Sequence, residues 1–187
     1  MSSPSDLALA AQGLAAALSA SAINAGDAMR LLSVMAAPTA TIVPINTAVG
    51  AAMAAMQNAM GDLFRRAAVV EIAIASSTYQ PSSSNDAATV RTMVCTLLDN
   101  EILVAGNQSE DGVFSALRTL RAAVVADLNA RGAGLASVRT FKLNASLPAC
   151  VIAQQIYGDP SREAELVTQA NPPHPAFMPT TFTVLSS

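Results

Sequence analysis

Apolar residues recur at helical spacing along most of this chain, and one run is especially regular. Its members follow one another at intervals of 4, 3, 4, 3, 4, 3 and 4 residues: Val49, Met53, Met56, Met60, Leu63, Ala67, Val70 and Ile74. This spacing predicts one face of a long helix. We interpret this face, called the seam below, as the core-facing side of a central helix. A homomeric coiled coil is the alternative, because the seam keeps the heptad period.

Further helical patterns lie on both sides of the seam. Residues 5–20 and 24–36 predict two short amphipathic helices. The sets Val90, Val94, Leu97 and Val113, Leu117, Leu120, Val124, Leu128 mark two more apolar faces. Two prolines and a β-branched run predict an extended break at residues 37–46. Residues 1–134 are therefore predicted to form a helical bundle of about five helices.

The pattern changes after Gly134. The run "SVRTFKLNA" alternates and predicts a strand, and "TTFTVLS" predicts a second strand at the end of the chain. Between them we expect a helix capped by Ser146 with Pro148 in its first turn, and another helix over residues 161–171. The predicted fold class is α+β, mostly α, with a small β-α-α-β module at residues 135–187.

Composition restricts the classes of partner. Hydrophobic residues make up 52% of the chain and charged residues 12%, against roughly 25% charged residues in ordinary soluble domains. A surface this poor in charge favours coverage by other subunits. The net charge is −3 and the cations form no basic stripe, so we expect no direct contact with nucleic acid. Residues 31–61 carry no charge, but prolines and amides interrupt them, so no membrane span is predicted.

The sequence offers little chemistry. The single histidine, His174, lies between Pro173 and Pro175, and no Cys, Asp or Glu stands at the spacing of a local metal site. Cys95 and Cys150 stand alone and are interpreted as buried thiols. We therefore predict no enzyme activity and no catalytic, cofactor-binding or metal-binding residues.

Charged side chains are interpreted as structural. Asp159, Glu163 and Glu165 lie where a helix begins, which favours capping and interaction with the helix dipole over paired catalytic carboxylates. Two arginine pairs, Arg65 with Arg66 and Arg118 with Arg121, are predicted to form solvated or intersubunit ion pairs.

The C-terminal segment resembles a LysM module. The family's Ser/Thr-Leu corresponds to Ser146-Leu147, its Ile-Ala to Ile152-Ala153, its Tyr-Gly break to Tyr157-Gly158, and its closing Asn-Pro to Asn171-Pro172. Glycan-binding members place Gly-Asp before the Ser/Thr, whereas Asn144 and Ala145 stand there in this chain.

A longer run, "LPACVIAQQIYGDPSREAELVTQANPPHPAFMP", is similar to the C-terminal end of the Mu-type phage DNA-circularisation protein family. The upstream runs "LRAAVVADLNARGAGLASV" and "DAMRLLSVMAA" also resemble that family's C-terminal helical region. The resemblance covers most of this chain but only the C-terminal portion of the longer family proteins. Two positions depart from the family pattern, with Ala176 in place of a Gly and Thr180-Thr181 in place of a Gly-Gly turn.

The resemblance implies a virion structural protein of the tail baseplate or tube-hub adaptor, assembled in the host cytoplasm. Expected partners are other phage tail proteins of the hub, tube or baseplate wedge, with several copies arranged in three- or six-fold symmetry. The implied protein-docking residues are Tyr157, Gly158, Asp159, Pro160, Asn171, Pro173, His174, Pro175, Phe177 and Met178. Peptidoglycan binding during cell-wall passage and DNA circularisation remain the alternatives.

Overall fold

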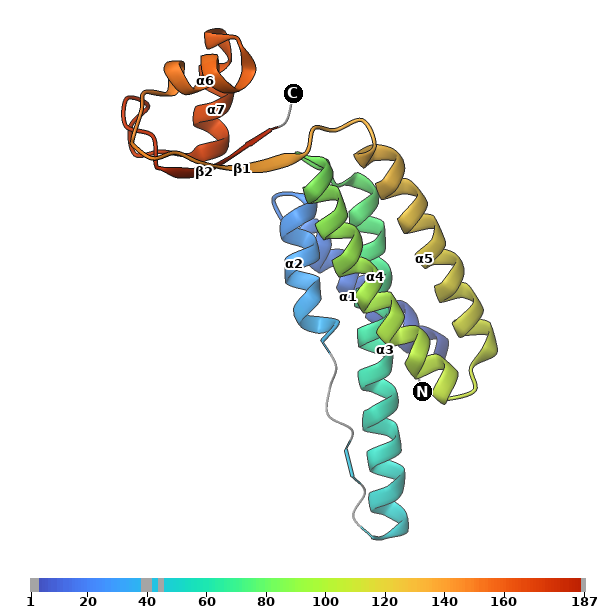
Figure 1. Cartoon of the computed structure of the whole chain (residues 1–187). Helices are drawn as coiled ribbons and strands as arrows, with labels where there is room; N and C mark the ends of the chain where they lie inside the picture. The colour runs from blue at the N-terminus through green and yellow to red at the C-terminus, as the bar shows by residue number, and fades with distance from the viewer. Residues whose placement is uncertain (1–3, 38–41, 44–45, 186–187) are drawn as a thin grey trace. The chain divides into compact units, whose positions relative to one another are not determined.

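The computed structural model describes residues 4–37, 42–43 and 46–185 (Figure 1). Within these residues the protein is mostly helical and carries a two-stranded antiparallel sheet. The predicted class, α+β and mostly α, is therefore confirmed. Most of the extended break predicted at residues 37–46 lies outside the described residues.

Two compact units are distinguished by the contacts within the chain. The helical unit comprises Met1–Gln80 and Thr89–Asn129, and the C-terminal unit comprises Pro81–Ala88 and Ala130–Ser187. The helices α4 (Ser84–Asn107) and α5 (Asp111–Gly132) have residues in both units. The predicted domain boundary after residue 134 stays a prediction.

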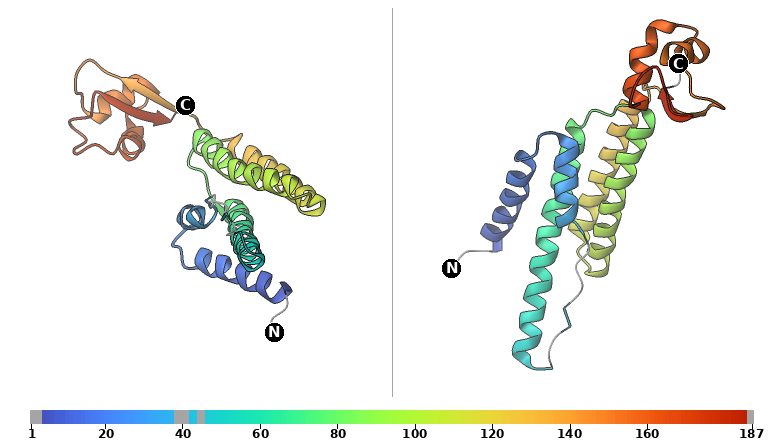
Figure 2. Two further views of the ribbon diagram at one scale, coloured as in Figure 1. Left: turned by 90° about the horizontal axis from the view of Figure 1, so that it is seen from below. Right: turned by 90° about the vertical axis from the view of Figure 1, so that its left-hand side faces the viewer.

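The helical unit begins with α1 (Pro4–Ala20), α2 (Ala25–Met35) and the long α3 (Ala48–Thr78), which the views of Figures 1 and 2 show side by side. Side-chain caps explain two of the helix starts. Asn24 Oδ1 accepts the Asp27 N–H at 2.9 Å at the start of α2, and Thr47 Oγ1 accepts the Gly50 N–H at 3.0 Å at the start of α3. Each cap satisfies a backbone donor that the first helical turn leaves without a partner.

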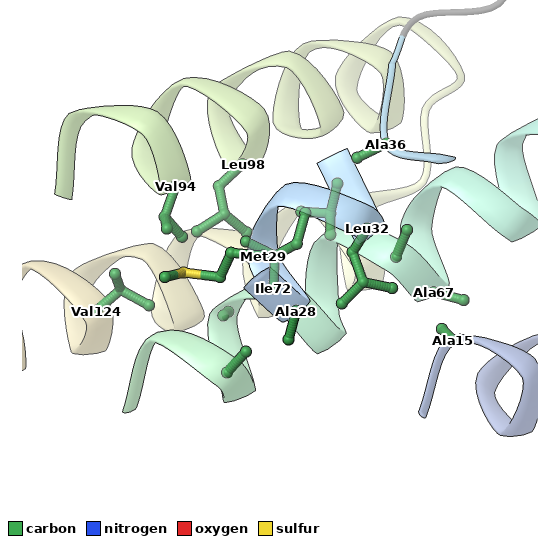
Figure 3. Close-up of a cluster of buried hydrophobic side chains, with 14 of the residues drawn as sticks. Ala15, Ala28, Met29, Leu32, Ala36, Ala67, Ile72, Val94, Leu98 and Val124 are labelled. Carbon is green, nitrogen blue, oxygen red and sulfur yellow. The ribbon is translucent and has the colours of Figure 1, made fainter. Parts of the chain in front are cut away.

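The core of the helical unit is built from medium-sized aliphatic side chains and alanines (Figure 3). The buried positions that Figure 3 labels come from all five helices: Ala15, Ala28, Met29, Leu32, Ala36, Ala67, Ile72, Val94, Leu98 and Val124. The alanines let helix backbones approach closely, and the larger side chains fill the space between them.

The seam of α3 is core-facing over only part of its length, so the prediction was wrong for the rest. Ala67 is buried and Leu63 is half-buried, but Val49, Met53, Met56, Met60 and Ile74 are exposed. The buried residues of α3 are instead Ala54, Arg65, Ala67, Ala68, Val69, Ile72, Ala73, Ala75 and Ser76. Alanine occurs on every side of this helix, so the sequence makes two faces apolar. In the folded chain the face of α3 that carries Val69 and Ile72 is the one buried against the other helices.

The C-terminal unit contains the sheet. Strand β1 (Val138–Lys142) pairs antiparallel with β2 (Thr181–Leu185), with Thr140 opposite Thr183. Between the strands lie α6 (Ala149–Tyr157), the short 3-10 helix η1 (Pro160–Arg162) and α7 (Glu163–Ala170). This order agrees with the one that the sequence predicts for this segment.

A separate core holds the C-terminal unit together. Its buried members are Ala149, Ile152, Ala153, Leu166, Met178, Phe182 and Val184. The two from β2 alternate along the strand, as expected when one face of a sheet is covered.

The predicted role of Ser146 as a helix cap was wrong. Helix α6 begins at Ala149 with Pro148 at the N-cap position and no side-chain cap. The Ser146 hydroxyl instead donates to the Met178 carbonyl at 2.8 Å. It therefore fastens the segment before α6 to the segment before β2.

Candidate functional site

The described residues contain no group of three or more His, Cys, Asp or Glu side chains that could hold a metal ion. Cys95 and Cys150 are both free thiols, and Cys150 is exposed, contrary to the prediction that it is buried. No described helix combines the length and apolar character needed to cross a bilayer. The candidate sites described below are surfaces that carry the predicted docking residues, and a groove of the helical unit.

The first group of predicted docking residues forms the turn after α6. Gly158 ends that helix with φ of 70°, in the left-handed region that glycine adopts without steric strain. Asp159 Oδ1 accepts the Ser161 N–H at 2.9 Å, and Pro160 is the first residue of η1. Hydrogen bonds from Ser161 lower the pKa of Asp159. This carboxylate therefore acts as a turn cap, as the sequence indicates.

Tyr157 in the same turn is partly covered. The Arg162 guanidinium lies 3.8 Å from the centre of the Tyr157 ring, which is a cation–π contact. Two hydrogen bonds to Glu165, of 2.9 and 2.8 Å, hold that guanidinium in place. Burial raises the pKa of Tyr157. Only part of this ring is left for a partner.

The second group lies on the proline-rich segment after α7. Asn171 ends α7 in the left-handed conformation, with φ of 43°. His174 Nδ1 accepts the Ala176 N–H at 3.1 Å, and the His174 carbonyl accepts the Phe177 N–H at 3.0 Å. His174 is thus fixed by local backbone contacts.

Two backbone bonds tie the proline-rich segment to the beginning of α6. The Ala149 N–H donates to the Pro175 carbonyl at 2.8 Å, and the Met178 N–H donates to the Leu147 carbonyl at 3.1 Å. With its prolines, these bonds hold the segment in one conformation.

The predicted docking residues of this segment differ in their exposure to solvent. Pro173, His174 and Pro175 are exposed, and Phe177 shows 71% of its surface. Together these four residues form what we call the proline face. Met178 is 0% exposed, so its assignment as a docking residue was wrong. Its side chain belongs to the core of the C-terminal unit.

The predicted docking residues therefore form two separate groups. The turn that contains Gly158 follows the last residue of α6, whereas Pro175 is bonded to Ala149, its first residue. A nine-residue helix is about 13 Å long, at a rise of about 1.5 Å per residue. The two groups lie at opposite ends of α6, so a single compact contact does not use both equally.

The helical unit has a groove that the sequence did not predict. It has a volume of about 920 Å³ and apolar walls formed by Leu7, Ala55, Met56, Ala59, Met60 and Leu63. At the edge of the groove, Asn58 bonds the N–H and the carbonyl of Ile42, at 3.0 and 3.3 Å. Sequence reasoning found the methionines but assigned them to the core. The signal in the sequence that could have placed them at the surface of a groove is the absence of charged residues from residue 31 to residue 61.

Polar and charged residues also line the groove. Asp62, Arg66, Gln108 and Glu110 line it, and Arg66 Nη2 lies 2.6 Å from Glu110 Oε2. The predicted solvated or intersubunit pairing of Arg65 was wrong, because Arg65 is buried and pairs with the buried Glu101 within the helical unit.

For the second arginine pair, Arg118 and Arg121, the structure agrees better with the predicted solvated ion pairs. Arg121 forms a two-point ion pair with Asp99, and both side chains are partly exposed. The Arg118 guanidinium lies 5.6 Å from the centre of the Phe114 ring.

The ionisation of Asp62 makes the contribution of this cluster to stability depend on pH. Burial would raise the pKa of Asp62, but hydrogen bonds from Gln108 and Arg65 outweigh it and lower the pKa. A carboxyl group with a lowered pKa in the folded state stabilises the fold above its unfolded pKa of about 3.9. It loses that contribution as the pH falls through the folded pKa.

We therefore expect Asp62→Asn to reduce the free energy of unfolding by about 1 kcal/mol near neutral pH. The difference from the wild type should shrink toward zero as the pH falls through the lowered pKa of Asp62. Urea unfolding at neutral pH and over a series of acid pH values measures this. Asp99→Asn, which breaks the more exposed pair with Arg121, is the control and should have the smaller effect at neutral pH. A deficit in Asp62→Asn that persists at low pH would contradict the assignment.

Comparison with models of protein families and with curated protein sequences finds no match to this chain.

Proposed function

We propose that this chain is a non-catalytic structural component of a phage tail, in the baseplate or the tube-hub adaptor. It docks neighbouring tail proteins through a helical bundle and a LysM-like module. The observation that carries the proposal is the proline face, where an exposed phenylalanine stands on a backbone segment that is already held rigid.

Association costs free energy for each side chain and loop that must become ordered. Hydrogen bonds to α6 and the proline rings order the proline face before any partner arrives. Aromatic anchors on such a surface dominate the binding energy of protein interfaces. Phe177 is the exposed aromatic residue of this face.

The family resemblance is supported by where its motifs lie. The Tyr157-Gly158 pair ends α6, and Asn171 ends α7 in the left-handed conformation. Ser146 and Leu147 lie in the segment that is bonded to Met178. These three motifs thus occupy turns of a β-α-α-β unit, and the fourth, Ile152-Ala153, lies inside α6 with both residues buried.

Gene replacement in the phage or prophage that encodes the chain tests the proposal. Without the gene we expect incomplete tails, and Phe177→Asp should reduce tail assembly although the chain still folds. Ile23→Asp is the control, since Ile23 is also exposed and lies far from the proline face in the sequence. Normal tails that eject DNA in the absence of the chain would refute the proposal. Saturable binding of the chain to purified sacculi would instead support the peptidoglycan alternative.

A further inference from the structure

The first part of α3 carries apolar side chains that no described element covers. Val49 exposes 71% of its surface, Met53 55%, Met56 61% and Met60 37%. These residues keep the 4-3-4 spacing, so they lie in one stripe along the helix. We call them the exposed seam. Ala52 and Ala59 flank the stripe on one side, and their small side chains permit the close approach of another helix.

The groove continues this surface. Met56 and Met60 belong both to the exposed seam and to the groove wall, and Leu7 of α1 forms the opposite side. The apolar surface is therefore a stripe that ends in a hollow. The most exposed side chain of the stripe, Val49, lies at the end away from that hollow.

We propose that the exposed seam pairs antiparallel with the exposed seam of a second copy of this chain. The spacing of the stripe is the same when it is read in either direction. A two-fold axis between Ala54 and Ala55 therefore places Val49 of each copy against Met60 of the other, and Met53 against Met56. A symmetric dimer requires this self-complementarity. The pairing also brings the exposed Val49 of one copy to the groove of the other.

The distribution of charge selects the antiparallel direction. No charged residue occurs between Arg30 and Asp62, so the paired stripes meet without desolvating a charge. In a parallel pair in register, the two Asp62 residues would lie at the same level along the helix axes, as would the two Arg66 residues. In the antiparallel pair the two Asp62 residues are about 22 Å apart along the helix axes, at about 1.5 Å per residue. The helix dipoles are also opposed, which is favourable.

The area of the exposed seam and the groove indicates how tightly two copies would associate. A specific interface takes roughly 800 Å² from each partner. The stripe from Ala48 to Met60 is about 20 Å long, so the exposed seam alone makes a small interface, to which the groove wall and Leu7 add apolar surface. We therefore expect a reversible dimer whose population rises with concentration.

Sedimentation of the full chain over a range of concentrations tests the pairing. The wild type should pass from monomer to dimer. Met56→Glu should raise the dissociation constant roughly 100-fold, because two carboxylates enter an apolar contact beside the axis. Leu103→Glu is the matched control, since Leu103 on α4 is similarly exposed and lies outside the stripe, and it should dimerise like the wild type. A wild type that stays monomeric at its highest soluble concentration overturns the proposal, as does unchanged dimerisation of Met56→Glu.

Disulfide trapping tests the direction of the pair. In a Cys150→Ser background, which removes the exposed native thiol, a mixture of Val49→Cys and Met60→Cys chains should form a crosslinked heterodimer. Neither variant alone should crosslink at a comparable rate. Crosslinking of Val49→Cys with itself would indicate a parallel pair and overturn the antiparallel arrangement. The proposal does not depend on a role in a phage tail, so its failure leaves the proposed function untouched.

Discussion

Replacing Arg65 with methionine is expected to lower the free energy of unfolding by about 3 kcal/mol. The side chain of Arg65 is 8% exposed and that of Glu101 is 1% exposed. Arg65 Nε donates to Glu101 Oε1, and Arg65 Nη2 donates to Asp62 at 2.8 Å. Without the guanidinium, Glu101 keeps only the more distant Arg66 Nε at 3.4 Å. A buried carboxylate that has lost its main partner cannot recover the hydration it gave up on folding.

The double variant Arg65→Met with Glu101→Leu should recover most of this loss, because it removes both charges and fills the space with apolar atoms. Arg66 would still have Glu110 as a partner at 2.6 Å. Arg121→Met is the control and should change stability much less than Arg65→Met, since its pair with Asp99 is exposed. Urea unfolding at neutral pH measures all three. A double variant no more stable than Arg65→Met would show that unpaired charge does not cause the loss.

Met178→Ala is expected to destabilise the protein by about 2–5 kcal/mol, whereas Phe177→Ala should change stability by less than about 0.5 kcal/mol. Met178 is fully buried among Ile152, Leu166 and Phe182, and truncating it leaves a cavity. Phe177, one residue earlier, is largely exposed. The proposed function predicts the opposite order for binding: Phe177→Ala should weaken capture of tail proteins although the fold is intact.

Two measurements separate these effects. Thermal or urea unfolding gives the stability of each variant, and binding assays at a temperature where all variants are folded give the docking. Equal losses of stability in both variants would contradict the burial of Met178 and the exposure of Phe177. Loss of binding in Met178→Ala alone, with Phe177→Ala unaffected, would remove the proline face from the interface.

The sequence predicted the fold class and the order of elements because periodicity and turn residues are local signals. Helix lengths followed from apolar spacing, and Gly158 predicted the end of α6 because a left-handed residue was needed there. The choice of buried face on α3 is not local. Alanines make two faces of that helix apolar, and only the positions of the other helices, α1 and α2 among them, decide which face is covered.

The same reasoning explains the misplaced site residues. Arg65 reads as a surface residue because its partner Glu101 is thirty-six positions away, and no local pattern joins them. Met178 and Phe177 are neighbours of similar hydrophobicity in a segment without regular structure, so periodicity could not assign either to the core. The hydrogen bond from the Met178 N–H to the Leu147 carbonyl helps to hold Met178 at the core. The two residues are separated in the sequence by α6, η1 and α7, so no local pattern joins them.

The central proposal is that the rigid proline face binds another polypeptide in an assembled tail. A density map of the intact tail, in which this chain is located, tests it most directly. The account predicts that Pro173, His174, Pro175 and Phe177 are covered by a neighbouring tail protein. A complete particle that leaves this face bare, or that does not contain the chain, would contradict it.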